Sequence, residues 1–404
     1  MTERAHAEAL DASDPLAGFR DRFVFDDGDR IYVDGNSLGR LPRAVEERVA
    51  AVVEEWGSSL VGGWHEWIDL PVRLGDLLAR EIVGARPGEV LVADSVTVNL
   101  YKLAAAALDR RPGVLVTPVD EFPTDRYVLQ GLGEVRLLEP DPTPEAVAEA
   151  CAPRDVALVC LSHVNYRSGA LADLAGITEA AHYAGALVLW DVCHSAGVVP
   201  IDLSGVDLAV GCTYKYLNAG PGAPAFLYVR EELQPELRSP IQGWFGQREQ
   251  FAMGPAYDPE PGIARFLAGT PPIVALAAVK PAVELVAEVG VPALREKSVA
   301  LTAYAIDLHD AWLAPLGFEL GTPRHAARRG SHVSLRHREG WRICRALIER
   351  ANVIPDFRAP DSVRFGLPPL YTRFVDVWDA LDRLRRLVED ETYLELDPTP
   401  RRVT

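Results

Sequence analysis

The middle of the chain alternates short apolar runs with helical patterns, and this alternation limits the possible folds more than any other feature. Seven apolar runs are strand candidates, at 90–92, 114–116, 135–138, 156–161, 186–190, 206–210 and 225–229. Helical patterns lie between several of them, at 96–108, 144–150 and 173–184. A repeated strand–helix–strand order predicts an α/β fold with a mostly parallel, seven-stranded sheet flanked by helices. Ligands bind to such sheets beyond the carboxyl ends of the strands.

The pattern changes past residue 280. Long helical patterns cover about 272–288, 291–313, 339–350 and 372–389, with strand candidates at 333–336 and 363–366. A chain of 404 residues exceeds one comfortable hydrophobic core, so a second, smaller α+β domain is expected. We predict a large domain over 45–288 and a small domain built from 1–44 and 289–404.

Bulk composition excludes several classes of partner. The net charge of −17 disfavours nucleic acid, because phosphate binding needs a basic face. No stretch approaches the roughly 18 apolar residues of a membrane span, and the first residues lack the apolar core of a signal peptide. The five cysteines are odd in number and have no CxxC spacing, which favours buried free thiols in a reducing, cytoplasmic setting. Histidines and cysteines form no metal-binding pattern, so we expect no metal site.

Two charged residues each follow a predicted strand and can face one crevice. Asp191 ends an apolar strand, where a carboxylate is costly unless it has a partner. A protonated pyridine nitrogen is one such partner, and an ordinary helix cap is an equally good explanation. Lys215 lies between Tyr214 and Tyr216, a setting that can lower its pKa and allow a Schiff base. A lone lysine there would more often be an exposed loop residue, but its pairing with Asp191 favours chemistry.

Three further motifs carry possible contacts with a ligand. Val96 and Thr97 open a helix directly after a strand, where free N–H groups and hydroxyls can hold a phosphate or simply cap the helix. Phe122 could stack on a planar ring, although a core or turn phenylalanine is the commoner case. Arg364 on a strand can form a two-pronged pair with a carboxylate, and a surface strand arginine is the alternative.

Together these residues resemble kynureninase, a fold-type-I enzyme that depends on pyridoxal 5′-phosphate (PLP). The resemblance runs from Asp34-Gly35-Asn36-Ser37-Leu38-Gly39 to Arg364-Phe365-Gly366-Leu367-Pro368-Pro369-Leu370-Tyr371. Its most specific stretches are 122–125, 161–166, 191–194, 214–220, 243–246 and 269–273. It implies PLP fold type I and hydrolysis of L-kynurenine, or a ring-substituted form, to an anthranilate and L-alanine.

The resemblance also implies a role for each matching residue. Lys215 would hold the cofactor and move protons, with Tyr214 and Asp191 as further catalytic residues. The remaining cofactor contacts would come from Val96, Thr97, Phe122, Asp125, Ser162 and His194. Trp244 and Thr270 match positions that reach the phosphate from the neighbouring subunit, which implies a homodimer. Arg364 would bind the α-carboxylate of a small amino-acid substrate, and Asn36 would also contact the substrate.

The sequence departs from the family at Gln247, where many members have histidine after Gly-Trp-Phe-Gly. This departure leaves the preference among ring-substituted kynurenines open. Two alternatives also stay open at this level. One is another PLP-dependent lyase, such as a cysteine desulfurase-like enzyme, which would need a cysteine on a mobile loop. The other is a PLP-binding protein without turnover, although such a scaffold needs no carboxylate clamp like Arg364.

Overall fold

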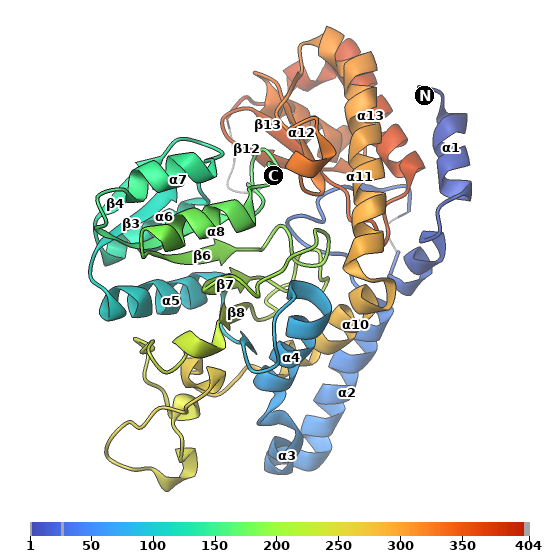
Figure 1. Ribbon diagram of the computed structural model, residues 1–404. Helices are drawn as coiled ribbons and strands as arrows, with labels where there is room; N and C mark the ends of the chain where they lie inside the picture. Colours follow the sequence, from blue (N-terminus) through green and yellow to red (C-terminus); the bar gives the residue numbers. More distant parts are fainter. Residues whose placement is uncertain (1, 26–27, 400–404) are drawn as a thin grey trace.

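A seven-stranded sheet forms the centre of the computed structural model, which describes residues 2–25 and 28–399 (Figure 1). The strands lie in the order β2 (Val90–Val92), β8 (Phe226–Val229), β7 (Leu208–Gly211), β6 (Leu187–Asp191), β5 (Val156–Ser162), β3 (Val114–Pro118) and β4 (Val135–Leu138). The strand β8 runs antiparallel to both of its neighbours, β2 and β7, and the other pairs of neighbouring strands are parallel. The predicted mostly parallel α/β sheet is therefore confirmed.

Helices cover both faces of this sheet. The helices α5 (Val96–Arg110) and α6 (Pro123–Leu132) contact each other on one face. On the other face lie α7 (Pro144–Cys151) and α8 (Leu174–Tyr183), seen above the strands in Figure 1. Alternate residues of β5 serve the two faces, because successive side chains of a strand point in opposite directions. Val159 joins the core under α8, and Leu158 joins the core under α5.

A second, antiparallel sheet lies at the top of the view in Figure 1. Its strands are, in spatial order, β12 (Asp356–Arg358), β13 (Ser362–Gly366), β10 (His332–Arg336) and β9 (Glu319–Leu320). Its helices are α11 (Val291–Leu308), α12 (Gly340–Arg350) and α13 (Phe374–Glu389). These elements share one hydrophobic core that also takes in Ala7, Ile31 and Val33 from the beginning of the chain. The exact division of the chain into two domains stays a prediction.

The N-terminal segments contact both parts of the molecule, the antiparallel sheet with its helices and the central sheet. The helix α1 (Arg4–Ala12) packs on α13, and β1 (Ile31–Tyr32) pairs with β11 (Val353–Ile354). The helices at the lower right of Figure 1 are α2 (Arg43–Ser59), α3 (Trp64–Trp67), α4 (Leu70–Leu78), α9 (Ile273–Ala277) and α10 (Val279–Val289). The helix α4 packs against β2 so closely that a Cβ on Gly75 would lie 1.9 Å from the Val90 carbonyl oxygen.

The structure refines several predicted boundaries. The single helical pattern at 272–288 is divided between α9 and α10, and the pattern at 291–313 ends its regular α-helix at Leu308. Four short strands, β1, β9, β11 and β12, were not predicted, because two or three residues give too little periodicity. The helices α1 to α4 and α6 were not predicted either.

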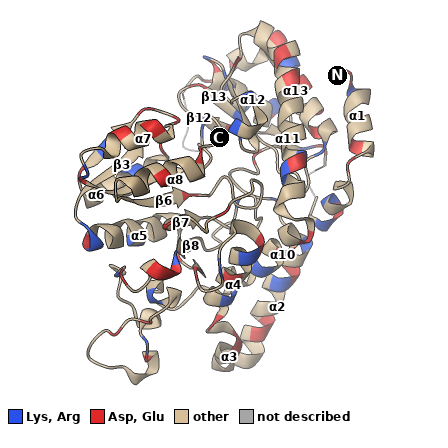
Figure 2. Cartoon of the chain, viewed as in Figure 1, with Lys and Arg blue, Asp and Glu red and all other residues tan. Residues whose placement is uncertain are grey.

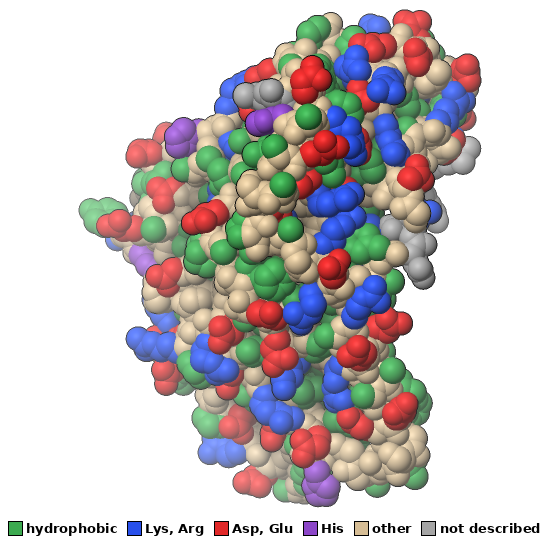
Figure 3. Space-filling view, turned by 90° about the vertical axis from the view of Figure 1, so that its right-hand side faces the viewer, with side chains coloured by type: hydrophobic (Ala, Val, Ile, Leu, Met, Phe, Trp, Pro, Cys, Tyr) green, Lys and Arg blue, Asp and Glu red, His purple; other side chains and the backbone are tan. Residues whose placement is uncertain are grey.

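Charge is distributed over the outer surface. Figure 2 shows that Lys, Arg, Asp and Glu lie mainly along the helices and are sparse in the central strands. On the face seen in Figure 3, acidic and basic side chains are interspersed. None of the described helices is long and apolar enough to cross a membrane.

Candidate active site

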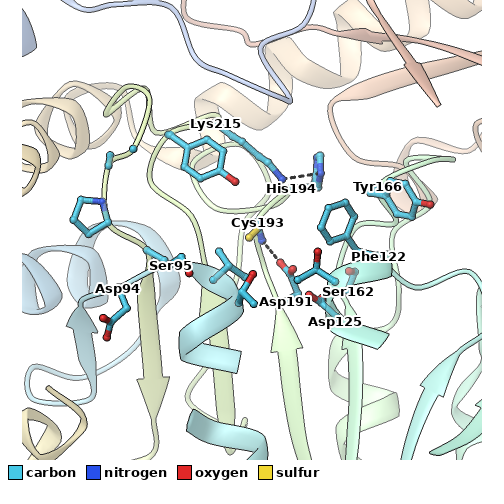
Figure 4. A pocket seen from close by; sticks show the side chains of 18 of the residues that line it. Asp94, Ser95, Phe122, Asp125, Ser162, Tyr166, Asp191, Cys193, His194 and Lys215 are labelled. Carbon is cyan, nitrogen blue, oxygen red and sulfur yellow. Dashed lines mark hydrogen bonds between the residues drawn. The ribbon is translucent and has the colours of Figure 1, made fainter. Parts of the chain in front are cut away.

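A cavity of about 460 Å³ opens at the carboxyl edge of the central sheet (Figure 4). The loops that follow β2, β3, β5, β6 and β7 all contribute to its wall. Its lining consists of Asp94, Ser95, Val96, Thr97, Phe122, Thr124, Asp125, Ser162, Tyr166, Asp191, Cys193, His194, Tyr214, Lys215, Gly222, Ala223, Pro224, Ala225 and Pro272. Strands of the same direction end at the same edge, which is why residues far apart in the sequence meet here.

Lys215 lies on the loop between β7 and β8, and this loop is well anchored. The Tyr214 carbonyl accepts a hydrogen bond from the Gly39 N–H at 2.8 Å, and the Thr213 hydroxyl donates to the Pro224 carbonyl at 2.6 Å. A Cβ on Gly39 would lie 2.3 Å from the Lys215 carbonyl oxygen, so only glycine allows this approach. The N-terminal segment around Gly39 therefore helps to hold the lysine loop in place.

The amine of Lys215 has one polar partner in the cavity. Its Nζ lies 3.0 Å from Nε2 of His194. Burial, followed by the positive charge of Lys215, lowers the pKa of His194 well below its ordinary value. A neutral imidazole can accept a hydrogen bond from the ammonium through Nε2. The pair therefore holds the lysine Nζ in a defined direction at one side of the cavity (Figure 4).

Buried carboxyl groups gather at the opposite side, where Asp191, Asp125 and Ser162 lie together in Figure 4. Asp191 ends β6, and its Oδ1 accepts a hydrogen bond from the Cys193 N–H at 2.6 Å. Burial, and then the charge of Asp191, raise the pKa of Asp125 well above its ordinary value. Oδ2 of Asp125 is buried without a hydrogen-bond partner. Such a site fits a cationic or N–H ligand group, because a buried carboxylate needs a counter-charge or a proton.

The third part of the site is the first turn of α5. The Ser95 hydroxyl accepts a hydrogen bond from the Val98 N–H at 3.4 Å, so Ser95 is the N-cap. Val96 and Thr97 follow it and line the cavity. The first N–H groups of a helix have no partner within it, point out of its N-terminal end and attract anions. Serine capping and anion binding can therefore coexist at this end of the cavity.

Phe122 provides an aromatic surface beside the acids. Its ring lines the cavity and makes an edge contact with Tyr166, with ring centroids 5.3 Å apart. The backbone of Phe122 is the N-cap of α6, so the direction of the side chain follows from the beginning of that helix. A planar ligand ring between Phe122 and the acid cluster would be held on one face by stacking.

Four predicted site residues do not line this cavity. Arg364 is buried on β13, where it donates to the Tyr166 carbonyl and the Ser37 hydroxyl and forms an ion pair with Asp356. Asn36 is also buried, and its Oδ1 lies against Gly366. Thr270 lies on an exposed loop, and Trp244 begins a short 3-10 helix (Trp244–Gly246), where its exposed ring contacts Phe245 and Phe251. The predicted contact of these two residues with a neighbouring subunit stays a prediction.

Two partnerships escaped the sequence reasoning. Glu121 accepts hydrogen bonds from Ser162, and Asp356 pairs with Arg364. Glu121 stands next to Phe122 in the sequence, but nothing in its own neighbourhood indicates that its carboxylate reaches the end of another strand. The pairing of β12 with β13 was likewise not predicted, because the three residues of β12 are too few to show a strand pattern. Gln247 also has a structural contact, since its Oε1 accepts from the Asp258 N–H at 2.7 Å.

Comparison with known proteins gives the chain close relatives. Residues 294–384 match the family model described as the kynureninase C-terminal domain. A kynureninase from Pseudomonas fluorescens is 45% identical over 416 residues, which cover 98% of each chain. Kynureninases from Burkholderia pseudomallei are equally similar, at 45% identity over 97% of each chain.

Solved structures show the same fold at much lower identity. The apo cysteine desulfurase from Thermococcus onnurineus NA1 superposes with a TM-score of 0.76 at 17% identity, covering 95% of this chain and 98% of that one. A lysine variant of the C-DES protein with glycine linked covalently to its PLP cofactor gives a TM-score of 0.76 at 18% identity, covering 89% and 97%. The predicted PLP fold type I is thereby confirmed.

Proposed function

The chain belongs to the kynureninase family, and from this premise we propose that it hydrolyses L-kynurenine, or a ring-substituted kynurenine, to an anthranilate and L-alanine. The observation that carries the proposal is the cavity in which Lys215 faces buried carboxyl groups at the carboxyl edge of the sheet. The 45% identity to a kynureninase over nearly all of both chains supports the cleavage of kynurenine as the reaction of this cavity. A cysteine desulfurase-like activity is not favoured, because it needs an acceptor thiol on a mobile loop, whereas all five cysteines are buried and only Cys193 reaches the cavity wall.

The cofactor is pyridoxal 5′-phosphate, and the cavity has a group for each of its parts. Lys215 has an amine for the aldehyde, the first turn of α5 has donors for the phosphate, and the acids suit the pyridine nitrogen. The unpartnered Oδ2 of Asp125 is the observation that fits best, because it leaves an acceptor in the buried wall. When bound, PLP supplies an electron sink for the bond-breaking steps at the amino acid.

Lys215 would carry two tasks. It would hold the cofactor covalently until the substrate amine replaces it, and it would then remove the proton from the substrate Cα. His194 would keep Nζ directed into the cavity, because it accepts from Nζ at 3.0 Å and stays neutral. A positioned amine can move a proton over a short distance near neutral pH.

The acid side would keep the cofactor ring protonated. We assign Asp191 to the pyridine nitrogen, with Asp125 beside it, since the two buried carboxyls are coupled electrostatically. Phe122 would stack on the ring and Ser162 would contact its edge. Val96 and Thr97 would bind the phosphate through backbone N–H and hydroxyl groups.

Tyr214 would supply the proton at Cβ. Water adds to the γ-carbonyl of the substrate, the Cβ–Cγ bond breaks, and the aromatic acid leaves. The remaining three-carbon unit needs a proton at Cβ, and Lys215 would return the proton that it removed from Cα, to give alanine. Burial raises the pKa of Tyr214, which keeps its hydroxyl protonated and able to donate. The same hydroxyl is assigned to the cofactor phosphate, and Tyr214 lines the cavity beside Lys215.

Arg364 would bind the substrate α-carboxylate, with Asn36 nearby. Three of the five guanidinium N–H donors are taken by Tyr166, Ser37 and Asp356, which leaves donors for a ligand. Arg364 contacts the backbone of Tyr166, and Tyr166 lines the cavity. The guanidinium of Arg364 therefore lies directly behind a residue of the cavity wall.

The direct test is turnover by the pure protein. Protein reconstituted with PLP is incubated with L-kynurenine, 3-hydroxykynurenine and a ring-methylated kynurenine, and the anthranilate and alanine are quantified together. Equal amounts of both products are expected from at least one substrate. Absence of both products with all three would refute the proposed function. The ratio of kcat/KM among the three substrates would identify the preferred ring.

We also propose that the chain forms a homodimer through the outer face of α2 and α9. A groove of about 990 Å³ is lined there mainly by apolar side chains, and it shares Ala223 and Pro272 with the cavity. Val53 and Val274 in this groove are exposed, as is Trp56 at the end of α2. Large exposed apolar patches mark protein interfaces. A second copy on this face would border the site, as a contribution from Trp244 and Thr270 requires.

Sedimentation equilibrium tests the dimer. Val53→Glu combined with Val274→Glu should give monomers, while the same change at an exposed residue outside the groove, Leu394→Glu, should leave the dimer intact. A wild-type protein that sediments as a monomer at micromolar concentration would contradict the interface. Buried thiols also support the cytoplasmic location expected from the sequence.

A further inference from the structure

Glu121 is a buried acid beside the site to which the reaction assigns no role. It precedes Phe122 on the loop after β3, it is only 4% exposed, and it is not part of the cavity lining. Its carboxylate accepts three hydrogen bonds. Oε1 accepts from the Ser162 hydroxyl at 2.5 Å and from the Phe122 N–H at 2.8 Å, and Oε2 accepts from the Ser162 N–H at 2.7 Å.

These bonds fasten the ends of two neighbouring strands to each other. Ser162 ends β5, and β5 pairs with β3, whose following loop carries Glu121 and Phe122. The ring-stacking residue and the hydroxyl residue of the site are thus held by one carboxylate. Their relative position follows from Glu121 more directly than from the strand pairing, because the strand ladder ends before the loop begins.

We propose that Glu121 is a positioning residue that sets both the place and the hydrogen-bond direction of Ser162 at the cofactor site. This inference rests on the proposed function only in taking PLP as the cofactor. A serine hydroxyl has one proton to donate. While Glu121 is ionised, Ser162 donates that proton away from the cavity and presents only lone pairs to a ligand. A protonated Glu121 releases the serine proton and lets the hydroxyl donate into the cavity.

The surroundings place this exchange near neutral pH. Burial, and to a smaller extent the charge of Asp191, raise the pKa of Glu121 to about 7 despite its three hydrogen bonds. The other titratable groups around this acid cluster are Asp125 on α6, Cys160 on β5 and Lys215 across the cavity. Asp120, Asp141 and Arg328 also lie nearby, because they line a small second pocket together with Glu121 and Ser162. Burial, and then the charge of Asp191, raise the pKa of Asp125 well above its ordinary value. Glu121, with its pKa raised to about 7, changes its charge between pH 6 and pH 8.

The test measures the dissociation constant of PLP from the apoprotein by tryptophan fluorescence, so kynurenine turnover is not needed. Glu121→Ala and Ser162→Ala should each weaken PLP binding about tenfold, which is about 1.4 kcal/mol. The double variant should bind PLP at most about twentyfold more weakly than the wild type, because the two residues act through one hydrogen bond. Additive losses, near a hundredfold, would overturn the proposal.

A pH comparison supplies the second arm. The ratio of PLP dissociation constants at pH 6 and pH 8 should differ between the wild type and Glu121→Gln, and Ser162→Ala should give the same ratio as Glu121→Gln. An unchanged ratio in Glu121→Gln would also overturn the proposal. If Glu121→Ala fails to fold, the ratio of PLP dissociation constants at pH 6 and pH 8 is still compared between Ser162→Ala and the wild type. Equal ratios in these two proteins would overturn the proposal.

Glu89 offers a matched control. It is equally buried and accepts hydrogen bonds from the backbone N–H groups of Arg86 and Glu231, but it lies outside the cavity lining. Glu89→Gln should cost a similar amount of folding stability to Glu121→Gln and leave PLP binding within twofold of the wild type. A PLP loss equal to that of Glu121→Gln would mean a general effect on the fold. Failure of the proposed function is seen separately, as normal PLP binding without kynurenine cleavage.

Discussion

Replacing Asp356 with asparagine removes the negative charge that faces the buried guanidinium of Arg364. Arg364 is 1% exposed and Asp356 is 3% exposed, so neither charge can turn to solvent. Removing one partner of a buried ion pair costs about 3–5 kcal/mol, chiefly because the other charge stays buried without compensation. The remaining hydrogen-bond partners of Arg364 are the Tyr166 carbonyl and the Ser37 hydroxyl, which are neutral. The carboxyl of Asp34 also acts on Arg364, but burial raises the pKa of Asp34 to about 7, so it compensates the guanidinium only in part at neutral pH. We expect Asp356→Asn to lower the free energy of unfolding by about 3 kcal/mol, towards the lower end of this range because the asparagine carbonyl can still accept.

The opposite substitution, Arg364→Met, should cost less. Asp356 would keep Arg358, whose Nη2 lies 2.9 Å from its Oδ2, and the Ser37 hydroxyl at 3.1 Å. The carboxylate is therefore not left alone, and methionine fills much of the space of the arginine stem. We expect a loss of about 1 kcal/mol, of the order of one hydrogen bond. The two variants thus differ in stability by about 2 kcal/mol, in the direction opposite to their expected effect on substrate binding.

Urea unfolding of the apoproteins at pH 7, followed by circular dichroism, measures the stability difference. Steady-state kinetics of the PLP-loaded proteins measures the binding effect. Arg364→Met should raise KM for kynurenine ten- to a hundredfold, since a charge-assisted hydrogen bond is worth about 1.5–3 kcal/mol. Asp356→Asn should change KM less than Arg364→Met does. The reasoning is refuted if Arg364→Met is the less stable variant or if its KM equals that of the wild type.

Three further outcomes are expected. Lys215→Ala should lose both covalent attachment of PLP and turnover, and a variant that retained turnover would remove Lys215 from its assigned role. Burial lowers the pKa of His163 from 6.5 to about 4, so its contribution to the free energy of unfolding is present above pH 6.5 and is lost as the pH falls towards 4, a change of about 3 kcal/mol. In urea unfolding, His163→Gln should not show this loss of stability between pH 6.5 and pH 4. Parallel curves of stability against pH for the variant and the wild type would exclude the role of His163. Gly75→Ala should destabilise the protein by at least about 2 kcal/mol, because the new Cβ meets the Val90 carbonyl. Gly57→Ala in α2 has nothing within 4 Å of the new Cβ and should stabilise the protein by about 0.5–1 kcal/mol. Thermal unfolding measures both variants, and equal effects would contradict the close packing of α4 on β2.

Part of the site could be predicted because several of its residues lie in short sequence patterns that indicate their position in the fold. A strand that ends in Asp191, a helix that opens with Val96 and Thr97, and a lysine directly after a strand each have a short-range signature. The carboxyl-edge rule for parallel sheets then brings them to one place without knowledge of the strand order. Asp191, Lys215, Val96, Thr97 and Phe122 could be chosen in this way before the sheet order was known, whereas the other cavity residues, Asp125, Ser162, His194 and Tyr214, were implied by the resemblance to kynureninase.

Partnerships across elements were decided only by tertiary structure. The carboxylate of Glu121 reaches Ser162 because β3 and β5 are neighbours in the sheet, although α6, β4 and α7 lie between them in the sequence. Asp356 meets Arg364 because the short strand β12 pairs with β13. Neither strand order nor register follows from periodicity, since periodicity identifies which face of a strand is buried and not which strand lies beside it. Sequence alone thus determined the type of fold and predicted that Lys215 and Asp191 face one crevice, while the packing of the sheets decided which buried groups lie around them.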